Sequence, residues 1–249
     1  MDIKIKPIFC RMGSKATLRN LIPKHFPKTF NKYVEAFVGG GAIFFYNDFK
    51  DKKVILNDLD NKLMLNYRRI KSGLSGDISK YDSNDLDYLK NIYNKKGGTT
   101  MDKFVRFILE GCNTFGGKGQ GAPLYKNSNP APKLKKLDLY KNKLSDVTLT
   151  SKDYKNVIKQ NDGVNTFFYL DPPYEKSKRL YEKGVLDLEE LRDIIKKIKG
   201  KFLLSINDSP YTRKLFNDFN VIYIDVKGQG RGNSDIGGDR KELLVKNYE

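Results

Sequence analysis

A strand–turn–helix unit that occurs twice in succession constrains the fold of this chain more than any other feature. Residues 31–37 are typical of a strand that runs into three glycines, and residues 42–49 follow as a helix. Residues 54–56 predict a short buried strand, which an acidic turn and a helix to about residue 70 follow. Strands that alternate with helices in this way indicate a parallel sheet.

This alternation stops after residue 71. Helical patterns occupy most of residues 72–145, with a loop rich in glycine, asparagine and proline at 111–132. Strands are predicted again beyond it, at residues 147–149, 166–170, 201–206, 220–226 and 242–246. We therefore expect an α/β sheet domain made of residues 1–71 and 146–249, interrupted by a mostly helical insertion at 72–145. The link at 227–239 is too short and irregular for a crossover helix, so the last two strands should form an antiparallel hairpin.

The chain is strongly basic, with a formal net charge of +17 from 47 basic and 30 acidic residues. Such a charge attracts polyanions. We favour nucleic acid over an anionic membrane, because no lipidation motif or basic amphipathic anchor is evident. Lysine spread evenly over a surface would give the same charge. No apolar run approaches the roughly 20 residues of a membrane span, and the N-terminus lacks the apolar core of a signal peptide. We expect an intracellular protein, cytoplasmic or DNA-associated, with no membrane partner.

Cysteine and histidine are scarce. Cys10, Cys112 and His25 are too few for a disulfide framework or a zinc cluster. We expect a reducing compartment, no bound metal, and two ordinary half-buried thiols; His25 is expected on a helix surface.

Three glycines, Gly39, Gly40 and Gly41, follow the first predicted strand. Glycine lets the backbone turn tightly and approach a ligand ahead of a helix N-terminus. The dinucleotide fingerprint does not fit, because Phe44 stands where its last glycine should be, and no phosphate-binding Walker register fits residues 111–119. A tight strand-to-helix connection is the alternative role.

Asp58 lies just past the next predicted strand. In a doubly wound sheet, a carboxylate here can accept hydrogen bonds from the ribose hydroxyls of a nucleoside. Its alternative role is the N-cap of the following helix. The spacing after the glycine turn favours the nucleoside.

The most specific motif is Asp171-Pro172-Pro173-Tyr174, which follows a buried aromatic strand. The two prolines fix the backbone and lack N–H donors, so carbonyls beside the Asp171 carboxylate are free to face a ligand. Tyr174 offers a flat ring next to them. Acceptors beside a stacking ring suit an exocyclic amine on an aromatic base; a structural turn is the alternative.

Together these motifs resemble those of the Dam-type, alpha-group adenine-N6 DNA methyltransferases, which depend on S-adenosylmethionine. The resemblance spans nearly the whole chain and lies in residues 9–15, 34–45, 56–60, 170–174 and 241–248. It implies a Rossmann-like S-adenosylmethionine-dependent methyltransferase sheet with a terminal antiparallel hairpin. It also implies that the insertion at 72–145 is a target-recognition region within a catalytic domain.

The resemblance implies a set of cofactor contacts and no metal. Arg11 enters by position only, since the best-known members carry tryptophan there, and Asp153 with Tyr154 could instead form a helix cap. The implied S-adenosylmethionine-binding residues are Arg11, Lys15, Glu35, Phe37, Gly39, Gly41, Asp58, Asp153, Tyr154 and Asp171.

The implied chemistry belongs to Asp171, Pro172, Pro173 and Tyr174. Adenine N6 is hidden in the duplex, so the base must be flipped out. Tyr174 is then expected to stack on it, while Asp171 and the Pro172 carbonyl accept the amino hydrogens.

Cytosine-N4 enzymes usually carry serine in place of Asp171, and cytosine carbon-5 enzymes need a cysteine that usually follows proline. A catalytically inactive DNA-binding protein on the same fold should have lost Asp171 or the glycine loop, and both are present.

Double-stranded DNA is the expected partner, together with a possible cognate restriction endonuclease. Basic residues of the insertion suit phosphate contact, although a solvated charged face is an equal alternative. The arginine-rich stretch that reads GATC in Dam proteins is absent, which puts a GATC target in doubt. The lysines expected to bind DNA are Lys118, Lys126, Lys133, Lys135 and Lys136.

Overall fold

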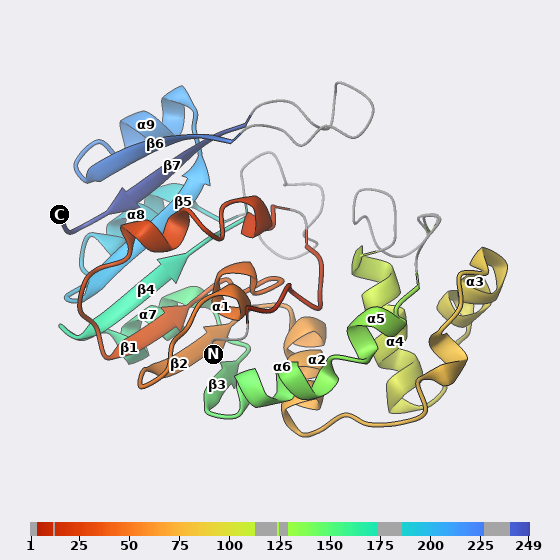
Figure 1. Cartoon of the computed structure of the whole chain (residues 1–249). Coiled ribbons are helices and arrows are strands. Elements are labelled where there is room, and N and C mark those ends of the chain that lie inside the picture. The colour runs from red at the N-terminus through yellow and green to blue at the C-terminus, as the bar shows by residue number, and fades with distance from the viewer. Residues whose placement is uncertain (1–3, 12, 113–123, 125–128, 174–185, 227–239) are drawn as a thin grey trace. The chain divides into compact units, whose positions relative to one another are not determined.

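The computed structural model describes residues 4–11, 13–112, 124, 129–173, 186–226 and 240–249 (Figure 1). The chain divides into two compact units. We call the first the helical unit; it comprises Met1–Ser14, Gly39–Asp48 and Asp60–Leu149. The second, the sheet unit, comprises Lys15–Val38, Phe49–Leu59 and Thr150–Glu249. The expected insertion at 72–145 falls within the helical unit, and its role as a separate target-recognition region stays a prediction.

Seven strands form one sheet in the described part of the chain, in the order β3-β2-β1-β4-β5-β7-β6. β1 pairs in parallel with both β2 and β4, and β4 pairs in parallel with β5. β7 is antiparallel to β5 and β6. The expected parallel sheet with a terminal antiparallel hairpin is therefore confirmed. The strands are β1 (Lys32–Glu35), β2 (Lys53–Asn57), β3 (Val147–Thr150), β4 (Thr166–Leu170), β5 (Lys201–Asn207), β6 (Asn220–Val226) and β7 (Arg240–Lys246).

The central strand β4 is buried along its whole length, which explains its continuous apolar run. Phe168 packs in a cluster with Val157 of α7 (Tyr154–Asn161) and Leu191 of α8 (Leu188–Ile195). On the neighbouring position, Phe167 contacts the rings of Phe26 and Tyr33. Successive strand residues point to opposite faces, so both faces of the sheet are covered by apolar side chains.

Short helices complete the sheet unit. Acidic or hydroxyl side chains cap three of them: Asp153 caps α7, Asp187 caps α8, and Ser209 caps α9 (Pro210–Leu215) with a reciprocal bond from Thr212. Two 3-10 helices precede β1, at Lys15–Thr17 (η1) and Ile22–His25 (η2). His25 is the half-buried last residue of η2, and its backbone carbonyl accepts a hydrogen bond from the Tyr248 hydroxyl.

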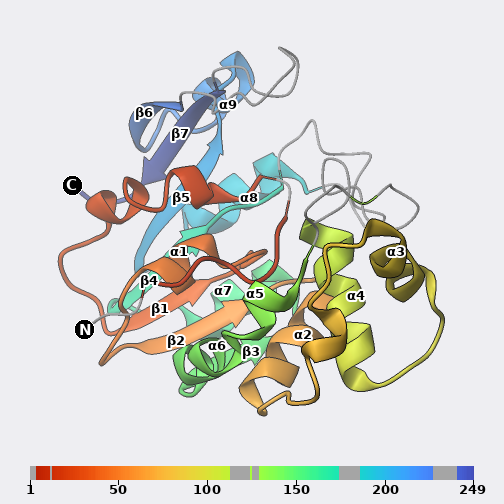
Figure 2. The same ribbon diagram turned by 45° about the vertical axis from the view of Figure 1, so that its right-hand side comes forward.

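Helices are the main regular elements described in the helical unit (Figure 2). α2 packs against α6, and α3 packs against α4. The core of this unit contains an aromatic cluster, in which Phe9 is edge-on to Tyr67 and Phe104. The helical part of the insertion that follows the loop at 111–132 is divided into two helices by a turn at residues 135–136. The elements are α1 (Ala42–Tyr46), α2 (Asn61–Lys71), η3 (Ser79–Tyr81), α3 (Leu86–Asn94), α4 (Thr100–Cys112), α5 (Ala131–Leu134) and α6 (Leu137–Leu144).

A disulfide joins Cys10 to Cys112 within the helical unit, with 4.8 Å between the two Cα atoms. The expectation of two separate thiols is therefore wrong. The partners are 102 residues apart in sequence, and they meet because α4 ends beside the N-terminal segment. No helix in the described ranges is long and apolar enough to cross a membrane.

Candidate active site

Asp171 directly follows β4, at the carboxyl end of the sheet's parallel strands. From β1 the chain adds β2 and then β3 on one side of the sheet, and it later adds β4 and then β5 on the other side. The direction in which strands are added therefore changes between β1 and β4. Open α/β sheets bind ligands outside the carboxyl ends of their strands at such a switch point. The fold therefore places the Asp-Pro-Pro motif where this architecture presents its ligand site.

Lys15 forms an ion pair with Asp171. Its Nζ donates to Asp171 Oδ1 at 2.5 Å, and the two side chains are 3% and 19% exposed. η1, which begins at Lys15, brings the lysine to the end of β4. Burial raises the pKa of Asp171 to about 6, although Lys15 acts to lower it, and Glu242 adds to the rise. The carboxyl group is therefore mostly ionised at neutral pH but close to its titration range.

The backbone after Asp171 has no N–H donor at two consecutive positions, because Pro172 and Pro173 follow. Pro172 is buried and Pro173 is half-buried. Tyr174 lies outside the described residues.

Glu35 ends β1 and is buried with 2% of its surface exposed. The Tyr33 hydroxyl donates to Glu35 Oε2 at 2.9 Å. Burial raises the pKa of Glu35 well above its usual value; the Tyr33 hydrogen bond opposes this, and the charges of Asp171 and Asp58 reinforce it. Glu35 thus interacts electrostatically with Asp58 and Asp171 at the carboxyl ends of the strands β1, β2 and β4.

Asn57 connects neighbouring chain segments by hydrogen bonds at the carboxyl ends of the strands, a role that the sequence analysis missed. Its side-chain nitrogen donates to the carbonyls of Ala36 and Lys152, at 3.0 and 2.9 Å. Its side-chain oxygen accepts from the Thr150 hydroxyl and the Lys152 amide, at 2.7 and 2.8 Å. All the hydrogen-bonding capacity of one buried amide is used to fix the position of the next residue, Asp58. An asparagine before the acidic residue was the available signal.

Asp58 is half-buried, and its backbone amide donates to the Thr150 carbonyl at 3.4 Å. The helix-cap alternative belongs to a different residue. Asp60 is the N-cap of α2, and its carboxylate accepts from the amides of Lys62 and Leu63 at 2.9 and 3.0 Å. The Asp58 carboxylate is therefore not required for the cap.

Phe37 and Tyr154 form an aromatic pair in the sheet unit, with ring centroids 5.3 Å apart. Tyr154 is buried, and its hydroxyl has no hydrogen-bond partner among the described residues. Burial raises the pKa of this hydroxyl. A buried donor left over beside an aromatic face is a feature that a polar, planar ligand would satisfy. Asp153 caps α7 by accepting from the Lys155 amide at 2.8 Å, as the helix-cap alternative predicts.

The glycine turn is tightly packed inside the helical unit. A Cβ on Gly40 would lie 2.6 Å from the Phe9 carbonyl oxygen, and one on Gly41 would lie 2.8 Å from the Phe45 ring. Gly39 and Gly41 have φ of +48° and +70°, in the left-handed region. Folding therefore requires these glycines whatever they bind. The Tyr67 hydroxyl donates to the Gly39 carbonyl at 2.9 Å and holds the turn.

Arg11 is also held within the helical unit. Its guanidinium pairs with Asp60 and lies 5.3 Å from the centroid of the Phe107 ring on α4. Arg11 therefore links the N-terminal segment to the start of α2 and to α4.

The lysines expected to contact DNA have different surroundings. Lys133 is half-buried, and its Nζ donates to the Ile8 carbonyl at 2.9 Å. Lys135 is exposed and pairs with Asp82 at 2.8 Å, and Lys136 is exposed. Lys118 and Lys126 lie outside the described residues. DNA contact stays a prediction for all five, and it fits the exposed pair better than Lys133.

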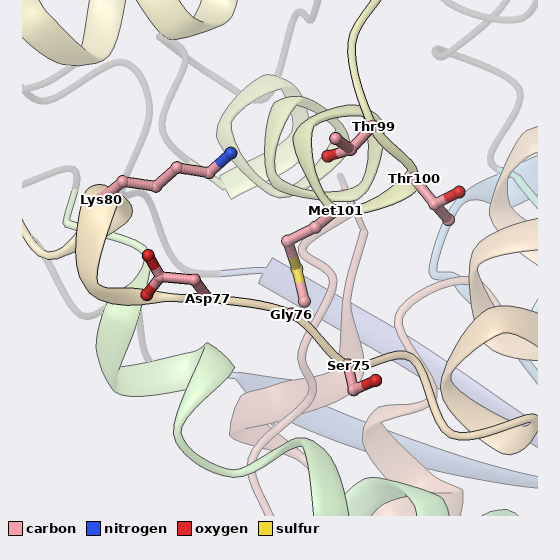
Figure 3. A pocket seen from close by; sticks show the side chains of 7 residues that line it. All are labelled: Ser75, Gly76, Asp77, Lys80, Thr99, Thr100 and Met101. Carbon is pink, nitrogen blue, oxygen red and sulfur yellow. The ribbon is translucent and has the colours of Figure 1, made fainter.

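A hollow in the helical unit lies apart in sequence from the Asp171 motif (Figure 3). Two of its polar side chains are already paired with residues outside the lining: Lys80 donates to Asp102 at 3.0 Å, and Asp77 accepts from the Ser79 amide and hydroxyl. Little is left there to recognise a cofactor. The lining residues are Ser75, Gly76, Asp77, Lys80, Thr99, Thr100 and Met101. In the described residues, no group of three or more histidine, cysteine or acidic side chains is placed to hold a metal.

Comparison with known proteins identifies the family of the chain. The family model of the D12 class N6 adenine-specific DNA methyltransferases matches residues 12–229. The chain is 27% identical to the Type II methyltransferase M1.LlaDCHI of Lactococcus lactis subsp. cremoris, over 99% of this chain and 96% of that one. It is 26% identical to the Type II methyltransferase M.CviBI of Paramecium bursaria Chlorella virus NC1A, over 98% and 100%. It is 25% identical to a DNA adenine methylase of Haemophilus influenzae, over 98% and 94%. The resemblance inferred from the motifs is confirmed, and the chain belongs to the D12 class N6 adenine-specific DNA methyltransferase family.

Proposed function

We propose that this enzyme transfers a methyl group from S-adenosylmethionine to the exocyclic N6 of adenine in double-stranded DNA, with Asp171 as the acceptor that aligns the amine. The observation that carries the proposal is the buried Lys15–Asp171 pair at the switch point of the sheet. The Lys15 ammonium favours the ionised form of Asp171 at neutral pH, and the ion pair holds the carboxylate in one orientation.

The adenine amine is a poor nucleophile, because its lone pair is conjugated with the ring. Asp171 and the Pro172 carbonyl accept its two hydrogens and draw the nitrogen toward a tetrahedral geometry. The bound S-adenosylmethionine supplies a methyl group already activated by its sulfonium, so the protein contributes mainly position and electrostatics, and the chemistry calls for no metal. The methylated nitrogen must then lose a proton. Asp171, with its pKa raised to about 6, can receive it.

The target base reaches this acceptor by leaving the duplex, which costs a few kcal/mol of unstacking. Tyr174 is the proposed stacking partner for the flipped adenine. Pro172 and Pro173 keep the segment between acceptor and ring stiff.

We propose that S-adenosylmethionine binds mainly at the carboxyl ends of the parallel strands. Asp58 accepts from its ribose hydroxyls, and Phe37 with Tyr154 flanks its adenine. Glu35 and Lys15 lie toward its methionine end. The unpartnered Tyr154 hydroxyl supports this fit. Arg11, Gly39, Gly41 and Asp153 complete the proposed set, with Gly39, Gly41 and Asp153 acting through backbone shape and capping.

The proposed setting is a restriction-modification system inside the cell. Two relatives named above are Type II methyltransferases. On this proposal a cognate restriction endonuclease recognises the same DNA sequence. The DNA phosphates are contacted by Lys118, Lys126, Lys135 and Lys136 of the methyltransferase.

A product analysis tests the proposal. The purified enzyme is incubated with S-adenosylmethionine and unmethylated DNA, and the DNA is digested to nucleosides for mass spectrometry. We expect N6-methyladenine with the wild-type enzyme and none with Asp171→Ala. The matched control is Asp193→Ala, which removes an exposed carboxylate from α8 and should leave the product unchanged. N4-methylcytosine, or no methylated base with wild-type enzyme that binds S-adenosylmethionine, would refute the assignment.

A further inference from the structure

The disulfide of the helical unit has a lysine against it. Lys133 Nζ lies 2.7 Å from Cys112 Sγ and 3.5 Å from Cys10 Sγ. Its third contact is the Ile8 carbonyl. No carboxylate pairs with Lys133 in the described ranges, and disulfide sulfurs are weak acceptors. The ammonium is therefore poorly compensated while the cysteines are joined.

Breaking the disulfide would supply the missing counter-charge. A thiolate on Cys112 would lie at ion-pair distance from the Lys133 ammonium, and a neighbouring cation favours the thiolate. Burial lowers the pKa of Lys133 to about 8, so the lysine is still mostly protonated at neutral pH. The two cysteines differ in access: Cys10 is exposed and Cys112 is half-buried.

We propose that Cys10, Cys112 and Lys133 form a reversible thiol–disulfide exchange site, at which a small thiol or disulfide of the glutathione class reacts with the exposed Cys10 sulfur and Cys112 serves as the lysine-stabilised thiolate. Proteins that act on DNA usually work where such small thiols are abundant, and cysteine pairs in those compartments commonly respond to redox state.

The proposed exchange takes place in two steps. A small thiolate attacks Cys10 Sγ and forms a mixed disulfide there, while the bond to Cys112 breaks and its electron pair leaves on Cys112 Sγ beside Lys133. A thiol with a stabilised thiolate is the better leaving group. A second small thiolate then attacks the small-molecule sulfur of the mixed disulfide. It releases the small disulfide and the Cys10 thiolate, which takes a proton from water. Two small thiols are oxidised and one protein disulfide is reduced; the reverse sequence oxidises the protein.

The oxidation state decides how firmly the segment of residues 8–11 is attached to α4. The disulfide is one connection and the Arg11 contact with Phe107 is another. Reduction removes the covalent one. We expect faster hydrogen–deuterium exchange in a peptide covering residues 8–11 when the protein is reduced.

The decisive experiment measures Cys112 alone, in a Cys10→Ser background. Its alkylation by iodoacetamide is followed by mass spectrometry from pH 5 to 10. A thiolate stabilised by Lys133 should titrate well below the usual thiol value of about 8.5. Lys133→Met should slow alkylation at pH 7 about tenfold, as expected for a thiol pKa raised by about one unit or more. Lys133→Arg should retain most of the rate.

Lys103→Met, which removes an exposed lysine from α4, the helix that ends at Cys112, is the matched control and should have no effect. In glutathione buffers of graded ratio, wild-type protein should interconvert between disulfide and dithiol, and Lys133→Met should shift that equilibrium about tenfold toward the disulfide. An ordinary titration of Cys112, equal rates with and without Lys133, or cysteines that never form the disulfide would each overturn the proposal. Neither assay uses S-adenosylmethionine or DNA, so failure of the proposed methyl transfer would leave these results unaffected.

Discussion

At the scale of single residues, the site depends on Asp171 being both half-buried and ionised. Burial favours the neutral acid and the Lys15 ammonium favours the carboxylate, so the pKa of Asp171, about 6, reflects their competition. A carboxylate in this range can accept hydrogen bonds at neutral pH and can also accept a proton after methyl transfer. Full exposure would favour only the first property.

Replacing Asp171 by alanine should abolish most methyl transfer, because it removes the only side-chain carboxylate of the proposed amine clamp. Loss of one charge-assisted hydrogen bond of about 1.5–3 kcal/mol corresponds to a fall of about 10- to 150-fold in rate, as a minimum. The same change removes the carboxylate that pairs with the buried Lys15 ammonium, which lowers stability. Single-turnover rates and thermal unfolding measure the two effects.

The double variant Asp171→Ala with Lys15→Met separates stability from chemistry. It should recover part of the unfolding temperature, because the buried lysine charge is removed together with the carboxylate that pairs with it, but none of the activity. Recovery of activity in the double variant would contradict the role assigned to Asp171.

Methyl transfer should lose rate as pH falls through about 6, since protonated Asp171 accepts fewer hydrogen bonds. The same group affects stability in the opposite sense. Its pKa in the folded protein lies above the unfolded value, so its contribution to stability falls as pH rises from about 4 to about 6. A pH profile of kcat/KM between 5 and 8 tests the acid limb, and Lys15→Met should move that limb to higher pH. A flat profile through this range would exclude Asp171 as the titrating group.

At the scale of elements, the strands that carry the site could be predicted from local sequence. β1, β2 and β4 appear as apolar runs that lead into glycine, acidic or proline-containing turns, and each motif lies within a few residues of the end of its strand. The contacts that stabilise these turns could not be predicted. Asn57 binds Lys152, the disulfide joins residues 102 apart, and Lys15 meets Asp171 across 156 residues. Such contacts depend on the complete packing and leave no periodic signal.

Two neighbouring aspartates at the end of β2 should respond differently to alanine. Asp58→Ala should weaken S-adenosylmethionine binding with little change in stability, because Asp58 is not required for the helix cap. Asp60→Ala should destabilise the protein by about 1 kcal/mol through loss of the α2 cap. Calorimetric titration with S-adenosylmethionine and urea unfolding of both variants make the comparison. Unchanged affinity in Asp58→Ala would remove the ribose role.

At the scale of the whole molecule, the net charge of +17 should make DNA binding strongly dependent on salt. Sequence alone could name candidate lysines but could not show which of them meet DNA, because charge patterning does not distinguish an interface from a solvated face. The structure favours Lys135 and Lys136 as the lysines that contact DNA, because both are exposed. Lys133 is half-buried, and its Nζ donates to the Ile8 carbonyl. Replacing Lys133 would disturb the cysteine pair as well as the charge, so it is unsuited to this test.

Lys135→Ala combined with Lys136→Ala should flatten the salt dependence of binding to duplex DNA. Each phosphate contact contributes about −0.9 to the slope of log affinity against log salt, so two lost contacts should reduce the slope by about 1 to 2. Lys135 already pairs with Asp82, and exchange of that partner for a phosphate would make its share the smaller. Sequence preference should change little, because phosphate contacts position the protein rather than select bases. The matched control, Lys159→Ala with Lys197→Ala, removes the same charge from exposed positions of the sheet unit. Equal slopes for the two double variants would mean that only the overall charge matters, and the phosphate contacts would then have to be made by other basic residues.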